Sequence, residues 1–378
     1  MSIDPLQFYN ILADVGIDFF TGVPDSLLKQ FCLCIDDNVS EDRHVITANE
    51  GNAIALASGY HLGTGKIPLV YMQNSGLGNA VNPLLSLCDP DVYSIPVIMV
   101  VGWRGEPGVK DEPQHVKQGL VQLDLIKALD LPYTIISKDE QDINTKVAGG
   151  IELSANENRP FVFVIKKGAF SKYRSDSSSN EEKMMKREKA LYILLSQFRE
   201  DVIIVSTTGK TSREIFEIRE RKGEPHYKDF LTVGSMGHCS SIALGIAISN
   251  PRRKVVCIDG DGALIMHMGS LSTVGKLKPK NFYHILMNNQ VHESVGGQAT
   301  SARFIDFQRL VNANDYNKVF FTDDEDELIS LVGKFMNETG PNFLELKVKP
   351  GSRKDLGRPT VKPVDNKKVF MKFIRDTL

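Results

Sequence analysis

Residues 254–289 read KVVCIDGDGALIMHMGSLSTVGKLKPKNFYHILMNN and carry the clearest signal of structure and chemistry in the chain. The apolar run Lys254–Ile258 leads into DGDG at 259–262, and a helix-like segment then leads to a second apolar run that ends in Asn288-Asn289. Apolar runs separated by helix-like segments predict parallel strands that are covered on both faces. Because the carboxyl ends of parallel strands meet at one edge of a sheet, we expect the acid and the amide to lie close together.

Oxygen-bearing groups at these two strand ends suit a hard metal ion. The carboxylate of Asp261, the side-chain carbonyl of Asn289 and the main-chain carbonyl of Val291 are the kinds of ligand that Mg²⁺ prefers. Phosphate oxygens suit the remaining coordination positions, and the helix start after Gly262 favours an anion. The sequence therefore predicts a magnesium site that also holds a phosphate group.

Three other known motifs conflict with the residues of this half of the chain. An EF-hand loop that starts at the first aspartate fails because Ala263 stands where an oxygen ligand is needed. A P-loop that ends at 209–211 fails because Ile204 replaces its first glycine, and a zinc-protease motif that starts at His292 fails because Gly296 replaces its second histidine. Gly-Asp-Gly and Asn-Asn are each common in ordinary turns, so the metal prediction depends on finding both.

Composition places the chain among soluble globular proteins. Its 378 residues suffice for two domains with separate cores, 42% of them are hydrophobic and 24% are charged. A formal net charge of −2 argues against a protein that binds nucleic acid or a membrane surface. The N-terminal segment lacks a signal-peptide pattern, no run approaches the ~18 apolar residues of a membrane span, and the five scattered cysteines are typical of reduced thiols. We therefore expect a cytoplasmic protein with no nucleic-acid or membrane partner.

Short β-branched runs alternate with helix-like segments along both halves of the chain. Predicted strands lie at His44–Thr47, Pro68–Met72, Ile95–Val101, Pro160–Ile165, Asp201–Ser206, Lys254–Ile258, Asn281–Met287 and Asn342–Val348. This alternation predicts two α/β domains, each a doubly wound parallel sheet, over residues 1–170 and 190–350. Residues 171–189 are Ser-rich and then heavily charged, which predicts a linker with a domain boundary near Ser175, and residues 351–378 predict a C-terminal arm.

The pairing of the two strand ends resembles the signature of thiamine-diphosphate-dependent enzymes. GDG at 260–262 is followed, after the 25 residues 263–287, by NN at 288–289. In that family the aspartate, the second asparagine and a carbonyl two residues later hold the Mg²⁺ that anchors the cofactor diphosphate. The resemblance implies that the cofactors are thiamine diphosphate and Mg²⁺, and that residues 190–350 form the diphosphate-binding domain.

The same resemblance implies a wider set of cofactor contacts in this domain. They are Thr207, Thr208, Gly209, Gly234, Ser235, Met236, Gly260, Asp261, Gly262, Ala263, Asn289 and Val291. Met236 stands where the family has a bulky apolar residue beneath the cofactor, although a core methionine would give the same pattern. Ala263 stands where many relatives have serine, so we expect Thr207, Thr208 and the main-chain amide of Gly209 to contact the diphosphate instead.

The first half supplies the other motif of such an enzyme. Residues 48–53, ANEGNA, follow a predicted strand and open an Ala-rich helix, which resembles the family's glutamate motif. The resemblance implies that Glu50 hydrogen-bonds the pyrimidine ring of the cofactor, favours its imino form and promotes formation of the nucleophilic ylid. It also assigns residues 1–170 as the pyrimidine-binding domain. Without the metal motif, Glu50 is explained as well by an acid that complements a helix dipole.

Two residues are candidates for the proton-transfer steps. Residues 21–26, TGVPDS, resemble the segment that carries a catalytic aspartate in 2-oxo acid decarboxylases, which points to Asp25. His115, in DEPQH at 111–115, is the second candidate. Asp25 also suits a helix N-cap before LLKQF, and His115 also suits an exposed loop.

The resemblance covers nearly the whole chain but includes no middle domain, which the larger members of the family have. The motifs resemble most closely those of the compact two-domain enzymes that act on phosphonopyruvate. The enzymes that act on sulfopyruvate are close relatives of that group. The motifs that carry this resemblance lie at 111–115, 206–213, 234–238, 292–298 and 351–353. The implied reaction is decarboxylation of phosphonopyruvate to phosphonoacetaldehyde and CO₂ through a thiamine-diphosphate ylid and an enamine.

An anionic 2-oxo acid substrate requires fixed donors. Candidates are Ser26, Lys210, Arg213 and His292, with Arg353 and Arg358 in the arm, although Lys210 and Arg213 are equally typical of solvated helix residues. A homodimer, or a multiple of it, with active sites at the subunit interface is implied because Glu50 and Asp261 serve opposite ends of one cofactor. Three alternatives stay open: sulfopyruvate as the substrate, carboligation of pyruvate, and a non-catalytic binding protein of this fold.

Overall fold

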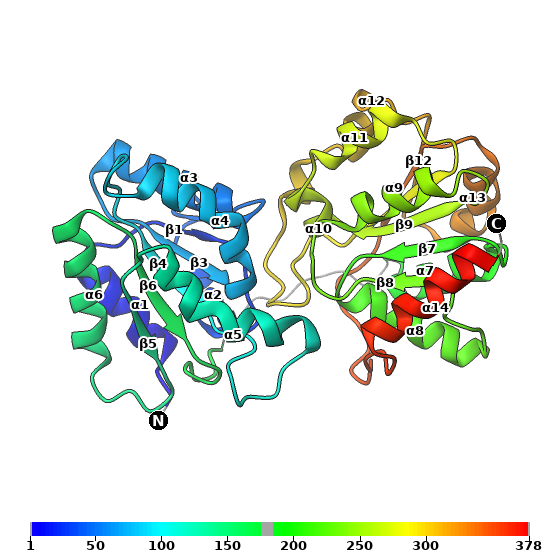
Figure 1. Cartoon of the computed structure of the whole chain (residues 1–378). Coiled ribbons are helices and arrows are strands. Elements are labelled where there is room, and N and C mark those ends of the chain that lie inside the picture. Colours follow the sequence, from blue (N-terminus) through cyan, green and yellow to red (C-terminus); the bar gives the residue numbers. More distant parts are fainter. Residues whose placement is uncertain (1, 175–183, 377–378) are drawn as a thin grey trace. The chain divides into compact units, whose positions relative to one another are not determined.

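Figure 1 shows the computed structural model, which describes residues 2–174 and 184–376. The chain divides into two compact units, Met1–Ser178 and Ser179–Leu378, and each is built around its own six-stranded sheet. Residues 175–183 of the predicted linker, together with the boundary predicted there, lie outside the described residues.

In the first unit the strand order is β2-β1-β3-β4-β6-β5, and every pairing between these strands is parallel. The strands are β1 (Phe20–Gly22), β2 (His44–Ile46), β3 (Leu69–Gln73), β4 (Ile98–Gly102), β5 (Tyr133–Ile136) and β6 (Phe161–Ile165). The helices are α1 (Pro5–Asp14), α2 (Lys29–Asn38), α3 (Glu50–Thr64), α4 (Leu77–Pro83), α5 (Pro113–Ala128) and α6 (Ile143–Glu157), with the short elements η1 (Asn74–Gly76) and η2 (Leu84–Cys88). Helical crossovers of this kind are what parallel pairing requires.

In the second unit the strand order is β11-β12-β10-β9-β7-β8, and its strands also pair in parallel. The strands are β7 (Ile203–Ser206), β8 (Asp229–Leu231), β9 (Val255–Gly260), β10 (Phe282–Asn288), β11 (Lys318–Thr322) and β12 (Asn342–Lys347). The helices are α7 (Arg187–Gln197), α8 (Lys210–Lys222), α9 (Cys239–Ser249), α10 (Asp261–Met266), α11 (Ser270–Leu277), α12 (Phe307–Ala313), α13 (Glu325–Asn337) and α14 (Pro363–Asp376), with η3 (Ser301–Phe304).

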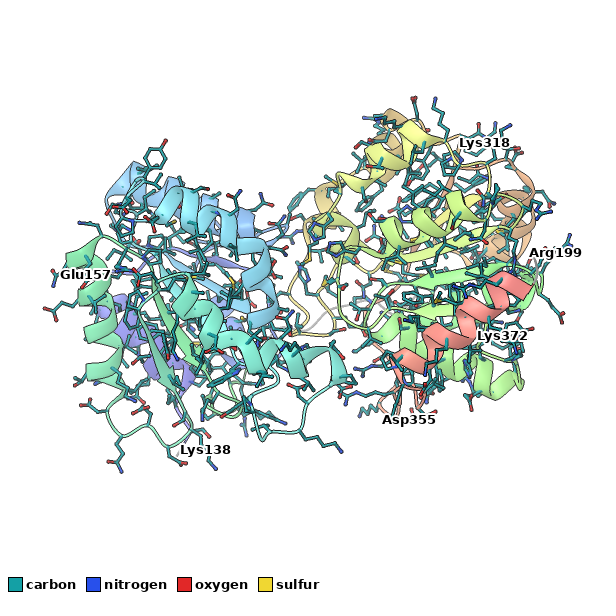
Figure 2. The ribbon with its side chains drawn as sticks, in the orientation of Figure 1. Lys138, Glu157, Arg199, Lys318, Asp355 and Lys372 are labelled. Atoms are coloured by element: carbon teal, nitrogen blue, oxygen red, sulfur yellow. The ribbon has the colours of Figure 1, made fainter. Side chains whose placement is uncertain are left out.

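The central strands are buried on both faces, as the apolar runs in the sequence predict. In β3, Leu69 and Tyr71 join one apolar cluster, whereas Val70 and Met72 join another. Successive residues of a strand point to opposite faces of a sheet, so the two clusters cover its two sides. Figure 2 labels charged side chains that are exposed at the periphery, namely Lys138, Glu157, Arg199, Lys318, Asp355 and Lys372. Within the described residues, no helix combines the length and apolar character that crossing a membrane requires.

The predicted fold class is confirmed, and each of the predicted strands overlaps a strand of the structure. Four strands escaped prediction: β1, β5, β8 and β11. β1 and β8 have three residues each, which is too short for a recognisable pattern. β5 and β11 lie at sheet edges and are mostly half-buried, and their apolar runs are short.

Candidate active site

Glu50 is the first residue of α3, which follows β2 after a short connection. The helix begins here because the side chain of Asn49 accepts a hydrogen bond from the main-chain N–H of Asn52. The Glu50 side chain is buried, and Asn79 Nδ2 donates to its Oε2 at 2.7 Å. A Cβ atom on Gly76 would lie 2.4 Å from Oε1, so glycine is required there. Glu50 is therefore held at the carboxyl edge of the sheet by residues that follow β3.

Asp25 lies between β1 and α2 and is completely buried. Its Oδ2 accepts a hydrogen bond from Leu27 N at 3.1 Å, whereas its Oδ1 has no hydrogen-bond partner among the described residues. Gly102 at the end of β4 makes room for it, because a Cβ there would lie 2.2 Å from Oδ2. Loss of hydration raises the pKa of Asp25 to about 6, although the charge of Arg104 opposes this rise. Asp25 is thus a buried carboxyl that keeps its proton to an unusually high pH.

Arg104, two residues beyond the end of β4, is a site residue that the sequence analysis missed. Its Nη1 donates to the Ser26 hydroxyl at 2.7 Å, and its Nε donates to Asp111 at 2.8 Å. Its Nη2 also donates to Asp111, so the carboxylate binds the guanidinium through both oxygens. The position of Arg104 just after a predicted strand was the available signal, since ligand-binding residues of parallel sheets gather at such ends.

His115 lies in the first turn of α5 and is half-buried, so the exposed-loop explanation of this histidine is wrong. A Cβ on Gly105 would lie 1.9 Å from the carbonyl oxygen of His115, which shows how closely the loop after β4 packs against this turn. Arg104 immediately precedes Gly105. The structure therefore brings His115 and Arg104 to the same junction of loop and helix.

Asp261 begins α10 at the carboxyl end of β9 and is almost completely buried. Thr300 Oγ1 donates to its Oδ2 at 2.5 Å. Burial raises the pKa of Asp261 to about 6, while hydrogen bonds from Thr300 and from the main chain at Gly262 and Asn289 lower it. These contacts confirm that the ends of β9 and β10 come together, as the spacing of the motif predicted.

Asn289 follows the last residue of β10, and both ends of its amide are engaged. Its Nδ2 donates to Glu293 Oε2 at 2.9 Å, and its Oδ1 accepts a hydrogen bond from Val291 N at 3.2 Å. This arrangement assigns the oxygen of the amide to the side of Val291 and the nitrogen to the side of Glu293. The side-chain oxygens of Asp261 and Asn289 and the main-chain oxygen of Val291 form a donor set that fits Mg²⁺.

The loops after β7 and β8 carry the other predicted cofactor contacts of this unit. Thr208 Oγ1 accepts a hydrogen bond from Gly234 N at 3.0 Å, which ties the two loops together. Gly209 and Gly234 have positive φ angles, which suit glycine. Met236 is half-buried on the second loop and does not belong to the apolar cluster around Val256, Ile285 and Leu344 in the core of this unit. Its location argues against the core-methionine explanation.

His292 and Ala263 lie beside the GDG turn. A Cβ on Gly262 would lie 3.1 Å from the His292 ring, so the ring packs directly against the turn. Loss of hydration lowers the pKa of His292 to about 4, so the ring is neutral near pH 7. Ala263 is buried and has no hydroxyl. A Cβ on Gly260, the first residue of the GDG turn, would lie 3.8 Å from the side chain of Thr207.

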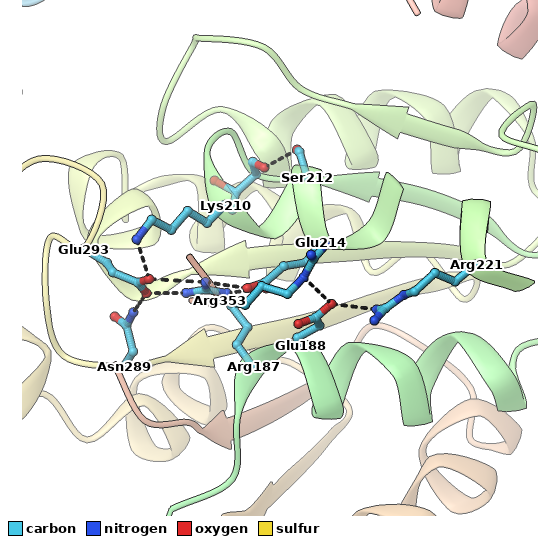
Figure 3. Close-up of polar contacts among 10 residues, drawn as sticks. Arg187, Glu188, Lys210, Ser212, Glu214, Arg221, Asn289, Glu293 and Arg353 are labelled. Atoms are coloured by element: carbon cyan, nitrogen blue, oxygen red, sulfur yellow. Dashed lines mark hydrogen bonds and ion pairs between the residues drawn. The ribbon is translucent and has the colours of Figure 1, made fainter. Parts of the chain in front are cut away.

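Lys210 is half-buried and takes part in an ion-pair network whose other members are mostly buried (Figure 3). Its Nζ lies 2.8 Å from Glu293, and Arg187 binds the same carboxylate together with Glu214. Burial alone would raise the pKa of Glu293, but hydrogen bonds and charges from Arg187 and Lys210 hold it below its usual value. Glu293 therefore connects the predicted metal ligand Asn289 to these two cations.

The remaining cations of the prediction have mixed surroundings. Arg213 is half-buried within α8. In the predicted arm, Arg353 forms ion pairs with Glu188 and Glu217 of the same unit. A direct substrate contact by Lys210, Arg213, Arg353 or Arg358 stays a prediction.

Comparison with known proteins identifies both halves of the chain. Residues 7–127 match the N-terminal TPP binding domain of thiamine pyrophosphate enzymes, and residues 207–346 match their C-terminal TPP binding domain. The chain therefore belongs to the family of thiamine-pyrophosphate-dependent enzymes, which confirms the predicted family and the predicted cofactor thiamine diphosphate.

Several curated relatives are similar along almost their whole length. Phosphonopyruvate decarboxylase from Streptomyces viridochromogenes is 34% identical, with 96% of this chain and 93% of the relative covered. The enzyme of the same name from Streptomyces hygroscopicus is 33% identical, with 96% and 92% covered. Sulfopyruvate decarboxylase from Methanosarcina acetivorans is 28% identical, with 90% of each chain covered.

Proposed function

We propose that this protein decarboxylates phosphonopyruvate to phosphonoacetaldehyde and CO₂ with thiamine diphosphate and Mg²⁺ as cofactors. The observation that carries the proposal is the 34% identity to a phosphonopyruvate decarboxylase over 96% of this chain. The site supports it, because Glu50, Asp261 and Asn289 each follow the carboxyl end of a parallel strand. Ligands of open parallel sheets bind at this edge.

The second unit would hold the metal and the diphosphate. Asp261 is buried and forms no ion pair within the described residues, so an ionised carboxylate there requires a cation. Mg²⁺ bound by Asp261, Asn289 and the carbonyl of Val291 meets that requirement. Around it, Thr207, Thr208, Gly209, Gly234, Ser235, Met236, Gly260, Gly262 and Ala263 would contact the cofactor.

The first unit would supply the proton transfers. Thiamine diphosphate, when bound, supplies the carbon nucleophile and the electron sink for the loss of CO₂. Glu50 would hydrogen-bond the pyrimidine ring, and its burial keeps water from competing for that bond. Asp25, with its pKa raised to about 6, would donate a proton to the reacting carbon. His115 is the second candidate for a proton transfer.

Sulfopyruvate is the second candidate substrate. A sulfopyruvate decarboxylase is 28% identical over 90% of this chain, which favours it over other 2-oxo acids. A sulfonate carries one negative charge, whereas a phosphonate near neutral pH carries up to two. The two substrates therefore require different numbers of donors around the anion.

We also infer a homodimer, or a multiple of it, with active sites at the subunit interface. The inference is supported by the division of Glu50 and Asp261 between the two units, since they serve opposite ends of one cofactor. A cytoplasmic location is supported by five cysteines that are all free and buried. Full activity of a monomer at high dilution would contradict the dimer.

The decisive experiment measures aldehyde release from phosphonopyruvate, sulfopyruvate and pyruvate side by side. Reactions without thiamine diphosphate, and with a chelator in place of Mg²⁺, serve as controls. We expect phosphonopyruvate to exceed the others in kcat/KM by more than about 100-fold, because a dianion gains several charge-assisted hydrogen bonds. Preference for sulfopyruvate, or a carbon–carbon bonded product from pyruvate, would contradict the proposed reaction but leave the cofactor assignment unchanged.

A further inference from the structure

Asp25, Ser26, Arg104 and Asp111 form one polar group at the carboxyl edge of the first sheet, which we call the Arg104 cluster. Arg104 connects its members, since it donates to both Ser26 and Asp111 and its charge acts on Asp25. None of the roles described above involves this guanidinium.

Arg104 has donors to spare. A guanidinium carries five N–H groups. Three of its nitrogens donate within the cluster, to Ser26 and to Asp111, and within the described residues these are its partners. One N–H on each terminal nitrogen is therefore available. The side chain is 16% exposed, so a ligand can reach these groups while little water competes for them.

The orientation of the guanidinium is fixed by Asp111. Besides binding Arg104 through both oxygens, the Asp111 carboxylate accepts hydrogen bonds from Gly105 N at 2.9 Å and Glu112 N at 2.8 Å. The Asp111 carboxylate is half-buried, which alone would raise its pKa, but these bonds and the charge of Arg104 hold the pKa well below its usual value. It is therefore ionised whenever the protein is folded near neutral pH.

The main chain at Arg104 is held from the other side as well. Asn74 Nδ2 donates to the carbonyl of Arg104 at 2.7 Å, and the indole of Trp103 donates to the carbonyl of Gly119 at 2.9 Å. A Cβ on Gly119 would lie 1.8 Å from the carbonyl oxygen of Gly105, so the loop rests directly on α5. A side chain anchored in this way loses little conformational freedom when it binds an anion.

We propose that Arg104 and the hydroxyl of Ser26 bind the phosphonate group of the substrate, and that Asp111 is a positioning residue that holds the guanidinium for this contact. The inference rests on the proposed function and extends it to a residue in the first unit. Ser26 is exposed, which leaves its hydroxyl accessible to the same ligand. A planar donor and a hydroxyl side by side suit the tetrahedral oxygens of a phosphonate.

The chemistry of decarboxylation explains why these donors serve the phosphonate instead of the carboxylate. A cation fixed on the leaving carboxylate would stabilise the ground state more than the transition state, in which that charge departs. The phosphonate charge does not change during the reaction, so strong binding there does not oppose bond cleavage. The phosphorus of the substrate is also only two bonds from the carbon that receives a proton. Arg104 could therefore bind the phosphonate while Asp25 protonates that carbon.

A bound phosphonate would also influence Asp25. An anion placed beside a buried carboxyl disfavours its ionised form and raises its pKa further. The Asp25 pKa is already about 6 because of lost hydration. Substrate binding would therefore help to retain the proton that the reaction requires.

The test compares Arg104→Lys and Arg104→Ala with the wild-type holoenzyme. We expect KM for phosphonopyruvate to rise about 10- to 100-fold, with a smaller change in kcat, because a charge-assisted hydrogen bond to the non-reacting end is lost. The inhibition constant of phosphonoacetate, a phosphonate probe with no reacting ketone, should rise in parallel. Arg159→Lys is the matched control, since Arg159 is 19% exposed and pairs with Asp130.

Two further measurements separate substrate binding from a structural role. The dissociation constant of thiamine diphosphate, measured by calorimetry, should stay within about twofold of wild type in the Arg104 variants. Asp111→Asn should raise KM about fivefold, but it should add nothing to Arg104→Ala in the double variant, because it acts through Arg104.

The possible results distinguish the role of Arg104 from the proposed function. Unchanged KM and inhibition constants in Arg104→Ala, with wild-type turnover of phosphonopyruvate, would overturn the role of Arg104 alone. Loss of cofactor binding in the same variant would also overturn it in favour of a structural role. Wild-type enzyme that turns over sulfopyruvate but not phosphonopyruvate would overturn the proposed function first, and the phosphonate contact with it.

Discussion

The two units have the same strand order, yet their carboxyl edges carry different chemistry. If β7–β12 are numbered as the first to sixth strands of their own sheet, the order β8-β7-β9-β10-β12-β11 becomes 2-1-3-4-6-5, which is also the order in the first unit. In the first unit, site residues follow β1, β2 and β4, and η1 after β3 supports them. In the second unit they follow β7, β8, β9 and β10. The same four strand positions therefore carry the site in both units.

The residues at these positions differ in a way that suits different tasks. The first unit buries Glu50 and Asp25 and places Arg104 close enough to act on Asp25, which suits proton transfer and anion binding. The second unit places Asp261 and Asn289 together, which suits a metal ion and a diphosphate. The comparison teaches that strand order determines where a site forms, whereas the loops determine what it does.

The first prediction tests the metal-binding edge. Asp261→Ala should weaken thiamine diphosphate binding by more than about 100-fold, because it removes the carboxylate that would hold Mg²⁺. Calorimetric titration with the cofactor and Mg²⁺ measures this loss. Asp315→Ala, at an exposed aspartate of the same unit that pairs with Lys278, is the control. Normal cofactor binding by Asp261→Ala would contradict the proposal that this edge of the second sheet binds Mg²⁺ and the diphosphate.

The second prediction tests the carboxyl edge of the first sheet, where we expect a loss of turnover and little loss of cofactor binding. Glu50→Gln should lower kcat about 1,000-fold, because general acid–base assistance is lost, while cofactor affinity changes less than about fivefold. Steady-state kinetics at saturating cofactor, combined with the same calorimetric titration, measures both quantities. If Glu50→Gln weakened cofactor binding strongly while kcat at saturating cofactor was unchanged, the assignment of Glu50 to chemistry would be wrong.

A smaller effect is expected from Glu293, which contacts the predicted metal ligand Asn289. Glu293→Gln should weaken Mg²⁺-dependent cofactor binding about 10-fold, because Glu293 accepts the hydrogen bond that orients the Asn289 amide. Glu220→Gln, at a carboxylate that is 60% exposed and pairs with His226, is the control. Equal affinities in the two variants would mean that the ion-pair network is unrelated to the metal site.

The last prediction concerns stability and pH at the first edge. The pKa of Asp25 is about 6 in the folded protein against an ordinary value of 3.8, so folding favours the protonated form. Stability from this group is complete below the ordinary pKa and is lost as the pH rises through 3.8 to about 6. Relative to Asp25→Asn, the wild-type free energy of unfolding should therefore fall by up to about 3 kcal/mol between pH 4 and pH 7. Urea denaturation at both pH values measures this, and a difference independent of pH would contradict it.

Much of the fold and the centre of each edge could be predicted from local sequence. Apolar runs such as Ile95–Val101 indicate buried parallel strands, and a polar motif directly after such a run lies at a strand end. Asp261 and Asn289 were predicted together for this reason, whereas Glu50 was predicted because residues 48–53, directly after a predicted strand, resemble the family's glutamate motif. Each of these predictions depends on short segments and on the strands next to them in the sequence.

Contacts between distant segments depended on the tertiary structure. Arg104 and Ser26 are 78 positions apart, and Lys210 and Glu293 are 83 positions apart. Their meeting depends on the order of the strands in the sheet and on the packing of the loops, which short-range patterns do not encode. The sequence by itself determined which residues stand at the strand ends, because burial of apolar runs is a local property. The tertiary structure decided which of those residues touch, because that depends on how the sheet and its loops pack.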